Sequence, residues 1–120
     1  MRENHFEDGK WWVSPYNFEP EVRASLELPE KVEIHDATLR DGEQTPGVVF
    51  SVDDKIAIAT KLDELGVDRI EAGMPAVSAQ DAEAITEISK LGLRSKIFTF
   101  ARAMRKDIDM ALDLSLIHIS

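Results

Sequence analysis

Apolar and polar residues alternate over residues 31–35, a pattern that predicts a short strand. A polar, glycine-containing stretch follows as far as Gly47. Apolar positions then recur every three or four residues from residue 52, which predicts a helix. Ser51 can accept a hydrogen bond from the backbone N–H of Asp54 at the start of this helix, and Gly66 supplies the left-handed residue that ends it.

The same order of elements then recurs. Residues 68–72 form a second predicted strand, and a helix begins at Ser78 and ends at Gly92. Residues 96–100 form a third strand, and residues 104–112 form the beginning of a third helix. Consecutive β-α units predict an α/β fold with a parallel sheet and outer helices, either doubly wound or a (β/α)8 barrel. Because such a barrel needs about 250 residues, this chain would supply the first three of its units.

The ends of the chain differ from this regular part, residues 31–113. Residues 1–30 hold five of the eight aromatic residues and three prolines, which predicts an irregular N-terminal arm with a short helical turn near residues 21–26. The arm is either a strap over its own domain or a subunit contact or lid. Residues 114–120 resemble a translated sequencing adapter, so we expect them to be artefactual; the alternative is a short strand.

The composition argues against several classes of protein. The 120 residues include 23 acidic and 14 basic side chains, for a net charge of −9, which argues against nucleic-acid and anionic-membrane partners. The absence of cysteine excludes disulfides and cysteine-based zinc sites. There is no apolar run of membrane-spanning length and no secretory signal at the start, so we expect a cytoplasmic protein.

Candidate chemistry follows the first predicted strand, where sites form in parallel α/β folds. Residues 36–44 are densely polar: Arg40 places a cation beside the hard oxygen ligand of Asp41, and Gly42 permits a sharp turn. A carboxylate here can hold a divalent cation, and the guanidinium can stabilise negative charge on a carbonyl or enolate oxygen. The alternative is an internal ion pair that only ties the loop.

The next two strand ends add further polar residues. Strand alternation places Glu71 on the face of Arg69, where its charge needs a partner, and Arg40 is the candidate; the alternative is a structural salt bridge. Arg102, after the third strand, either meets a substrate carboxylate or lies in solvent. We expect an apolar layer on the inward face of the sheet, formed by Val32, Ile34, Ile70 and Ile97.

Several of these segments resemble one enzyme superfamily. The sequence of residues 36–44, Asp-Ala-Thr-Leu-Arg-Asp-Gly-Glu-Gln, resembles the opening signature of the DRE-TIM metallolyases. It is most similar to the 2-isopropylmalate, homocitrate and citramalate synthases. Residues 71–75 resemble their E-x-G-x-P segment, and residues 101–109 resemble their third unit. The resemblance covers about residues 31–113.

The resemblance implies a (β/α)8 barrel that condenses acetyl-CoA with a 2-oxo acid in amino-acid biosynthesis, such as leucine biosynthesis. Asp41 then resembles the aspartate that binds a divalent cation (Mg, Mn or Zn), and Arg40 resembles the arginine that steadies the substrate carbonyl. Glu71 resembles the acidic partner of that arginine, and Gln44 a polar residue lining the site. The resemblance also implies a homodimeric full-length enzyme, of which this fragment alone would be inactive.

Two features separate the chain from parts of the superfamily. The His-x-His metal ligands of the family have no counterpart here, and neither His35 nor His118 matches them. Homocitrate-type enzymes carry a histidine in place of Phe100, which disfavours 2-oxoglutarate as substrate. The alternatives to a synthase are a metal-dependent C–C lyase similar to HMG-CoA lyase, and a non-catalytic acidic interaction module that binds through its aromatic arm.

Overall fold

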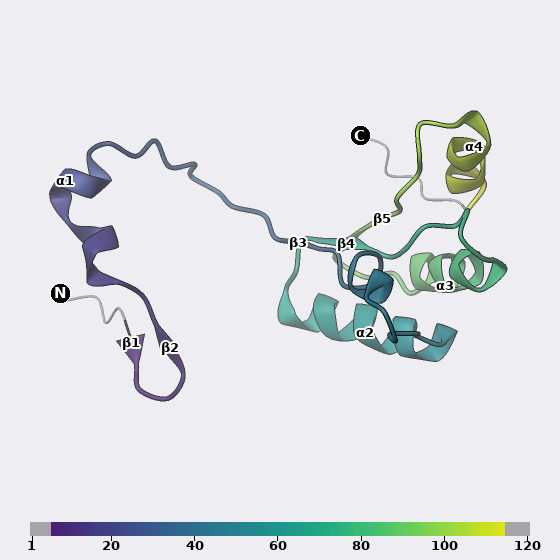
Figure 1. The fold of residues 1–120 in the computed structure, drawn as a ribbon, viewed down its shortest axis with the longest axis horizontal. Coiled ribbons are helices and arrows are strands. Elements are labelled where there is room, and N and C mark those ends of the chain that lie inside the picture. The colour runs from purple at the N-terminus through teal and green to yellow at the C-terminus, as the bar shows by residue number, and fades with distance from the viewer. Residues whose placement is uncertain (1–5, 115–120) are drawn as a thin grey trace. The chain divides into compact units, whose positions relative to one another are not determined.

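A computed structural model describes residues 6–114 of the chain, which divides into two compact units (Figure 1). One unit ends at Val32 and the other begins at Glu33. Of the expected artefact at residues 114–120, residues 115–120, with His118, lie outside the described residues. Among the described residues, no helix has both the length and the apolar character needed to cross a bilayer.

The N-terminal unit holds four short elements. Strands β1 (Phe6–Glu7) and β2 (Trp11–Trp12) form an antiparallel hairpin, followed by the 3-10 helix η1 (Pro15–Phe18) and the one-turn helix α1 (Pro20–Arg23). The predicted helical turn near residues 21–26 therefore begins one residue early, at Pro20. The hairpin was not predicted. Its aromatic side chains are largely exposed.

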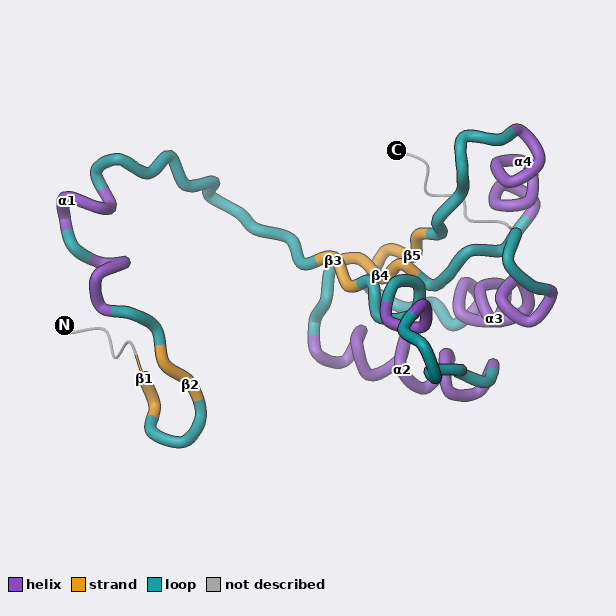
Figure 2. Tube along the Cα trace, in the orientation of Figure 1, coloured by secondary structure: helices purple, strands orange, loops and turns teal. Residues whose placement is uncertain are grey.

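The second unit contains the predicted parallel sheet (Figure 2). Its strands are β3 (His35–Asp36), β4 (Arg69–Glu71) and β5 (Lys96–Phe98), with β4 in the centre. Helices α2 (Val52–Leu65), α3 (Ala79–Lys90) and α4 (Arg105–Asp113) follow the strands in turn, and the 3-10 helix η2 (Gly42–Gln44) lies between β3 and α2. The α/β class and the parallel order of the strands are thus confirmed.

The first strand is shorter than predicted. Alternation favoured a strand over residues 31–35, but β3 covers only His35–Asp36, because it lies at the edge of the sheet and pairs with β4 alone. The ladder starts at Ile34, whose carbonyl accepts hydrogen bonds from the N–H groups of Asp68 and Arg69. Alternation by itself cannot show where a neighbouring strand begins.

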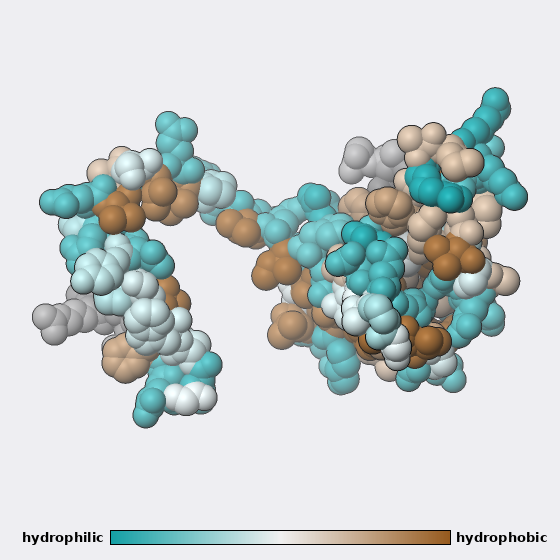
Figure 3. All heavy atoms as spheres, viewed as in Figure 1, coloured by the Kyte–Doolittle hydropathy of each residue, from teal (hydrophilic) through white to brown (hydrophobic). Residues whose placement is uncertain are grey.

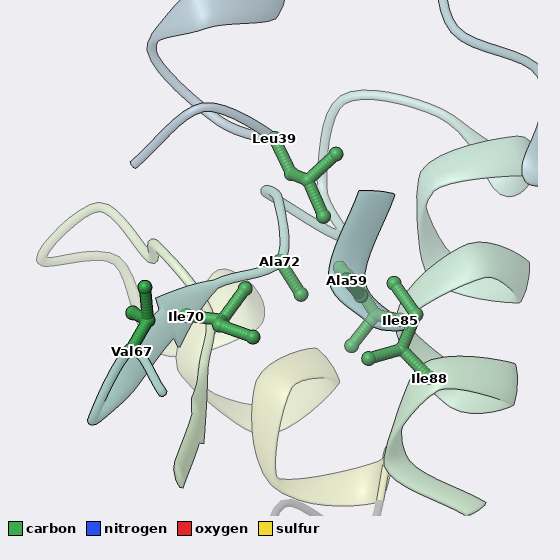
Figure 4. Close-up of a cluster of buried hydrophobic side chains, with 7 residues drawn as sticks. All are labelled: Leu39, Ala59, Val67, Ile70, Ala72, Ile85 and Ile88. Atoms are coloured by element: carbon green, nitrogen blue, oxygen red, sulfur yellow. The ribbon is translucent and has the colours of Figure 1, made fainter. Parts of the chain in front are cut away.

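The core lies between the sheet and helices α2 and α3 (Figure 4). Ile70 is fully buried there against Ile85 and Ile88 of α3 and Ala59 of α2. The prediction that Ile70 faces the barrel interior was therefore wrong: it faces the helices. Ile97 packs against the same core, whereas Ile34 is 60% exposed. The other face of the sheet carries the polar side chains discussed below.

The boundaries of α2 arise from local chemistry. Ser51 accepts a hydrogen bond from the N–H of Asp54, and the Asp54 carboxylate accepts one from the Ser51 N–H, which completes a capping box. The hydrogen bonds from Ser51 lower the pKa of Asp54. At the other end, Gly66 adopts φ 91°, a left-handed conformation that costs glycine little. Both ends agree with the sequence prediction.

We expect Ser51→Ala to lower the helicity of a synthetic peptide of residues 50–67. Loss of the N-cap hydroxyl leaves the Asp54 N–H without its acceptor and costs about 1 kcal/mol of helix stability. Circular dichroism at 222 nm, with a low fraction of trifluoroethanol, measures the change. Thr60→Ala is the matched control, because the Thr60 hydroxyl bonds to the Ile56 carbonyl inside the helix and its loss should not reduce helicity. Equal losses in both peptides would contradict this account of the cap.

Candidate functional site

The turn after β3 projects the predicted site residues from the end of the sheet. The Asp36 carboxylate accepts hydrogen bonds from the Thr38 N–H and hydroxyl, at 2.9 and 3.1 Å. The Ala37 carbonyl accepts from the N–H groups of Arg40 and Asp41, at 3.1 and 2.8 Å. Asp36 therefore folds its own turn, of the kind that Asp side chains often stabilise. The next two charged residues, Arg40 and Asp41, leave that turn side by side.

Arg40 and Glu71 form the centre of the site. The Arg40 Nη2 donates to Glu71 Oε2 at 3.2 Å, and Arg40 Nε lies 3.1 Å from Oε1 without completing a hydrogen bond. The two side chains are 23% and 11% exposed. The structure thus brings together these residues from the first two strand ends, as the sequence predicted. The contact by itself fits both a catalytic and a structural pair.

Asp41 and Phe100 flank the Arg40 guanidinium. Arg40 Nη1 donates to Asp41 Oδ1 at 3.0 Å, and the guanidinium carbon lies 5.2 Å from the centre of the Phe100 ring. The hydrogen bond to Glu71, with the charges of Glu71 and Asp41, raises the pKa of Arg40 against the opposing effect of burial. The guanidinium therefore stays charged at every physiological pH.

Backbone pairing brings the third strand end to this place. Beyond the regular ladder, the Ala72 N–H donates to the Phe98 carbonyl at 2.8 Å, and the Phe100 N–H donates to the Gly73 carbonyl at 2.9 Å. Gly73 has φ 143°, and a Cβ there would lie 3.5 Å from the Ile85 side chain. A glycine therefore suits this turn, which holds Phe100 beside the loop after β4.

His35 also contacts the central pair, although sequence reasoning did not nominate it. Its Nε2 lies 3.6 Å from Glu71 Oε2, and its ring centre lies 5.8 Å from that of Phe98. The signal was present in the register: His35 pairs with Arg69, so both lie on the same face as Glu71. Glu71 thus has a cation on one side and an imidazole on the other.

Gln44 and Arg40 line a cavity of about 310 Å³ at this end of the sheet. Gln44 ends η2, three residues beyond Asp41, and the cavity extends from it toward the start of α3. The other lining residues include apolar side chains and a charged cluster. They are Leu39, Glu43, Val48, Val49, Phe50, Lys55, Gly73, Met74, Val77, Ser78, Gln80 and Asp81.

Arg102 has a protein partner that the sequence did not suggest. Its Nε donates to Asp107 Oδ2 at 2.6 Å, and its Nη2 donates to Asp107 Oδ1 at 3.1 Å. These hydrogen bonds lower the pKa of Asp107, which is 2% exposed in the first turn of α4. Arg102 therefore holds the start of α4. If Arg102 also bound a substrate carboxylate, that carboxylate would share the guanidinium with Asp107.

Sequence reasoning missed a buried ionic cluster centred on Lys55. The Lys55 side chain is 1% exposed, its Nζ lies 2.5 Å from Glu43 Oε2, and it forms a second ion pair with Asp81. A signal existed in the sequence: Lys55 lies three residues after Val52 and four before Ala59, on the apolar side of α2. A charge at such a position requires a buried partner.

Asp41 is the candidate ligand for a metal ion. Asp41 offers a carboxylate with a 70% exposed side chain, a hard oxygen ligand suited to a divalent cation. Across residues 6–114, however, no group of three or more His, Cys, Asp or Glu side chains is arranged to hold an ion. Asp41 thus fits as one ligand and does not make a site alone.

Most of this chain is similar to known proteins of one family. A family model described as HMGL-like matches residues 31–119. Homocitrate synthase AksA of Methanothermobacter thermautotrophicus is 45% identical over 87% of this chain and 26% of its own length. The 2-isopropylmalate synthase of Methanocaldococcus jannaschii is 55% identical over 74% and 17%, and a putative (R)-citramalate synthase of Archaeoglobus fulgidus is 58% identical over 69% and 17%.

The chain spans about a quarter or less of the length of these relatives. The matched region nevertheless includes all three β-α units, and with them Arg40 and the residues that contact it, Asp41, Glu71 and Phe100. With most of its length matched by one family model, the chain belongs to the HMGL-like family, within the DRE-TIM superfamily that its first motif resembles.

Proposed function

We propose that the chain is the N-terminal part of a Claisen-condensing synthase that joins acetyl-CoA to a 2-oxo acid. In this proposal its three β-α units begin a (β/α)8 barrel. The observation that carries it is the fixed guanidinium of Arg40, held by Glu71 with the exposed Asp41 carboxylate beside it. The names of the relatives, all synthases of this type, favour condensation over the lyase reaction.

Arg40 would stabilise the negative charge that develops on the carbonyl oxygen of the 2-oxo acid. A guanidinium carries five N–H donors, and within residues 6–114 those of Nη1 and Nη2 each make one side-chain hydrogen bond. Further donors on the same nitrogens remain for a substrate oxygen. Glu71 would act by keeping the Arg40 guanidinium in one orientation, so that the guanidinium need not reorient as charge builds up on the substrate oxygen.

Asp41 would hold the divalent cation that such a reaction uses. When bound, a divalent cation would act as a Lewis acid that polarises the carbonyl of the 2-oxo acid. The remaining ligands would come from later segments of the longer enzyme.

For the substrate, we propose a 2-oxo acid with an apolar side chain, as in 2-isopropylmalate synthesis. Phe100 lies against Arg40 with an aromatic ring that has no hydrogen-bond donor for a second substrate carboxylate. The homocitrate relatives argue for the opposite choice, so the assay must include 2-oxoglutarate. Pyruvate and 2-oxoisovalerate are the apolar candidates.

A chimera tests the proposal. Residues 31–113 replace the matching segment of the Archaeoglobus fulgidus relative, and release of the CoA thiol is followed with each 2-oxo acid and with added Mn²⁺. We expect turnover that needs acetyl-CoA, a 2-oxo acid and the cation. A folded chimera that releases no thiol with any of the three acids would overturn the proposal. Cleavage of HMG-CoA by that chimera would support the lyase instead.

We expect Arg40→Lys in the chimera to lower kcat/KM more than tenfold. Lysine keeps the charge but cannot bond Glu71 and a substrate oxygen through one planar group, and a tenfold loss corresponds to about 1.4 kcal/mol in the barrier. Steady-state kinetics measures the change. Arg105→Lys is the matched control, because the Arg105 side chain is 95% exposed on α4. Parental kinetics for the Arg40 variant would show that charge alone matters or that Arg40 is structural.

A further inference from the structure

Lys55 links the segment that follows β3 to the start of α3, the helix that follows β4. Glu43 belongs to η2, two residues after Asp41, and Asp81 belongs to the first turn of α3, after the β4 loop. Both carboxylates contact the Lys55 ammonium, which comes from α2. The cluster therefore joins the segment that carries Asp41 to a helix packed in the core.

Each carboxylate has a further contact that fixes it in place. The second oxygen of Glu43, Oε1, accepts a hydrogen bond from the Phe50 N–H at 3.1 Å. Oδ2 of Asp81 accepts one from the Ser78 hydroxyl at 3.1 Å. Glu43 thus closes the loop of residues 43–50 on itself and also ties it to Lys55.

Stability alone does not account for this arrangement. Burial by itself lowers the pKa of Lys55, but hydrogen bonds and charges from Asp81 and Glu43 outweigh it and raise the pKa, so the ammonium stays charged. An apolar side chain of similar volume, with uncharged neighbours, often stabilises a buried position as well or better. The charged cluster instead fixes a position: the ion pair with Lys55 holds the Glu43 carboxylate at one point relative to α2.

We propose that Lys55 is a positioning residue for the site: through Glu43 it sets η2, and with it Asp41 and Gln44. The inference rests on the proposed function. Arg40, Gln44, Glu43 and Lys55 line one cavity, so a shift of η2 changes the space beside the Arg40 guanidinium. Misplacement of a binding group by about 1 Å can cost a hundredfold in rate.

The test compares four single variants in the chimera. Lys55→Met removes the cation, whereas Glu43→Gln and Asp81→Asn each remove one carboxylate and leave Lys55 the other. Glu43→Gln keeps the fold testable if Lys55→Met does not fold. The matched control is Lys61→Met, on the same helix, whose side chain is 77% exposed. Measurements are kcat, KM for the 2-oxo acid, and Mn²⁺ affinity by electron paramagnetic resonance, all well below each melting temperature.

We expect kcat to fall about ten- to a hundredfold and Mn²⁺ affinity to weaken in Glu43→Gln, and in Lys55→Met if it folds. The loss should be smaller in Asp81→Asn and absent in Lys61→Met. A lower melting temperature with parental kcat and Mn²⁺ affinity in Glu43→Gln would overturn the inference, as would equal losses in Glu43→Gln and Asp81→Asn. The unsubstituted chimera tests the proposed function separately, and Mn²⁺ affinity remains a readout for Lys55 if turnover is absent.

Discussion

Asp41→Asn is expected to lower kcat of the chimera at least about 100-fold. Changes to residues that only support a metal ligand already cost ten- to a hundredfold, and this one removes the charge of a ligand. The fold should persist. The Asp41 side chain is 70% exposed, and its ion pair with Arg40 lies at the surface, where such pairs contribute little. The melting temperature should therefore move by no more than about 4 °C. Steady-state kinetics over a Mn²⁺ titration and differential scanning calorimetry measure both effects.

Asp109→Asn serves as the control for Asp41→Asn. The Asp109 side chain is 62% exposed on α4, and its carboxylate lies 3.9 Å from Arg105 Nε. The same loss of charge there should leave kcat and the Mn²⁺ requirement at parental values. An Asp41 variant with near-parental turnover and unchanged Mn²⁺ affinity would remove Asp41 from the proposed metal site.

The helices could be predicted closely because their boundaries depend on neighbouring residues. Ser51 and Ser78 cap α2 and α3 through residues three positions away, and Gly66 ends α2 in its own left-handed conformation. The strands were predicted less well. The length of β3 depends on which residues of β4 lie opposite, and that information is not local.

Alternation of apolar and polar residues was not enough to predict which face of the sheet packs against the helices. Ile70 was expected to point inward, yet it packs on α2 and α3, while Arg69 and Glu71 take the opposite face. Alternation fixes which residues share a face but not which face the helices cover. In a sheet with helices on one side, the apolar set belongs to the helix side, and the polar set that remains is the one that meets Arg40.

Site residues could be predicted where many polar residues follow one another in a motif. They were missed where the interacting partners lie in other segments of the chain. Arg40 and Glu71 were paired from sequence because each needed a charge of opposite sign at the same sheet edge. The Asp107 partner of Arg102 was missed, since the short turn between them gives no periodic signal. Lys55 was missed because its partners come from two other segments, although its place on an apolar helix face predicts that it has some.

The strongest effect on stability is expected for the 120-residue chain by itself, which should show no turnover and no sharp unfolding transition. Parallel sheets are stable when both faces are covered, and here α2 and α3 cover one face. Among the described residues, the buried apolar side chains are eight of Ala, Val, Leu and Ile together with Pro75, and a core of that size gives no more than about 3–5 kcal/mol. Ile34 and Phe100 are 60% and 41% exposed, and Figure 3 shows apolar side chains at the surface of this unit.

Exposed apolar groups and an open strand edge favour self-association of the isolated chain. Differential scanning calorimetry and sedimentation velocity at several concentrations are the measurements. We expect a broad, weak heat-capacity change and a sedimentation coefficient that rises with concentration. The chimera is the control: with the rest of the relative present, the same residues 31–113 should unfold within one cooperative transition. A narrow transition of the isolated chain that stays at one temperature, from a species that sediments as a monomer, would show that these three β-α units fold independently and would contradict the assignment of the chain as part of a larger barrel.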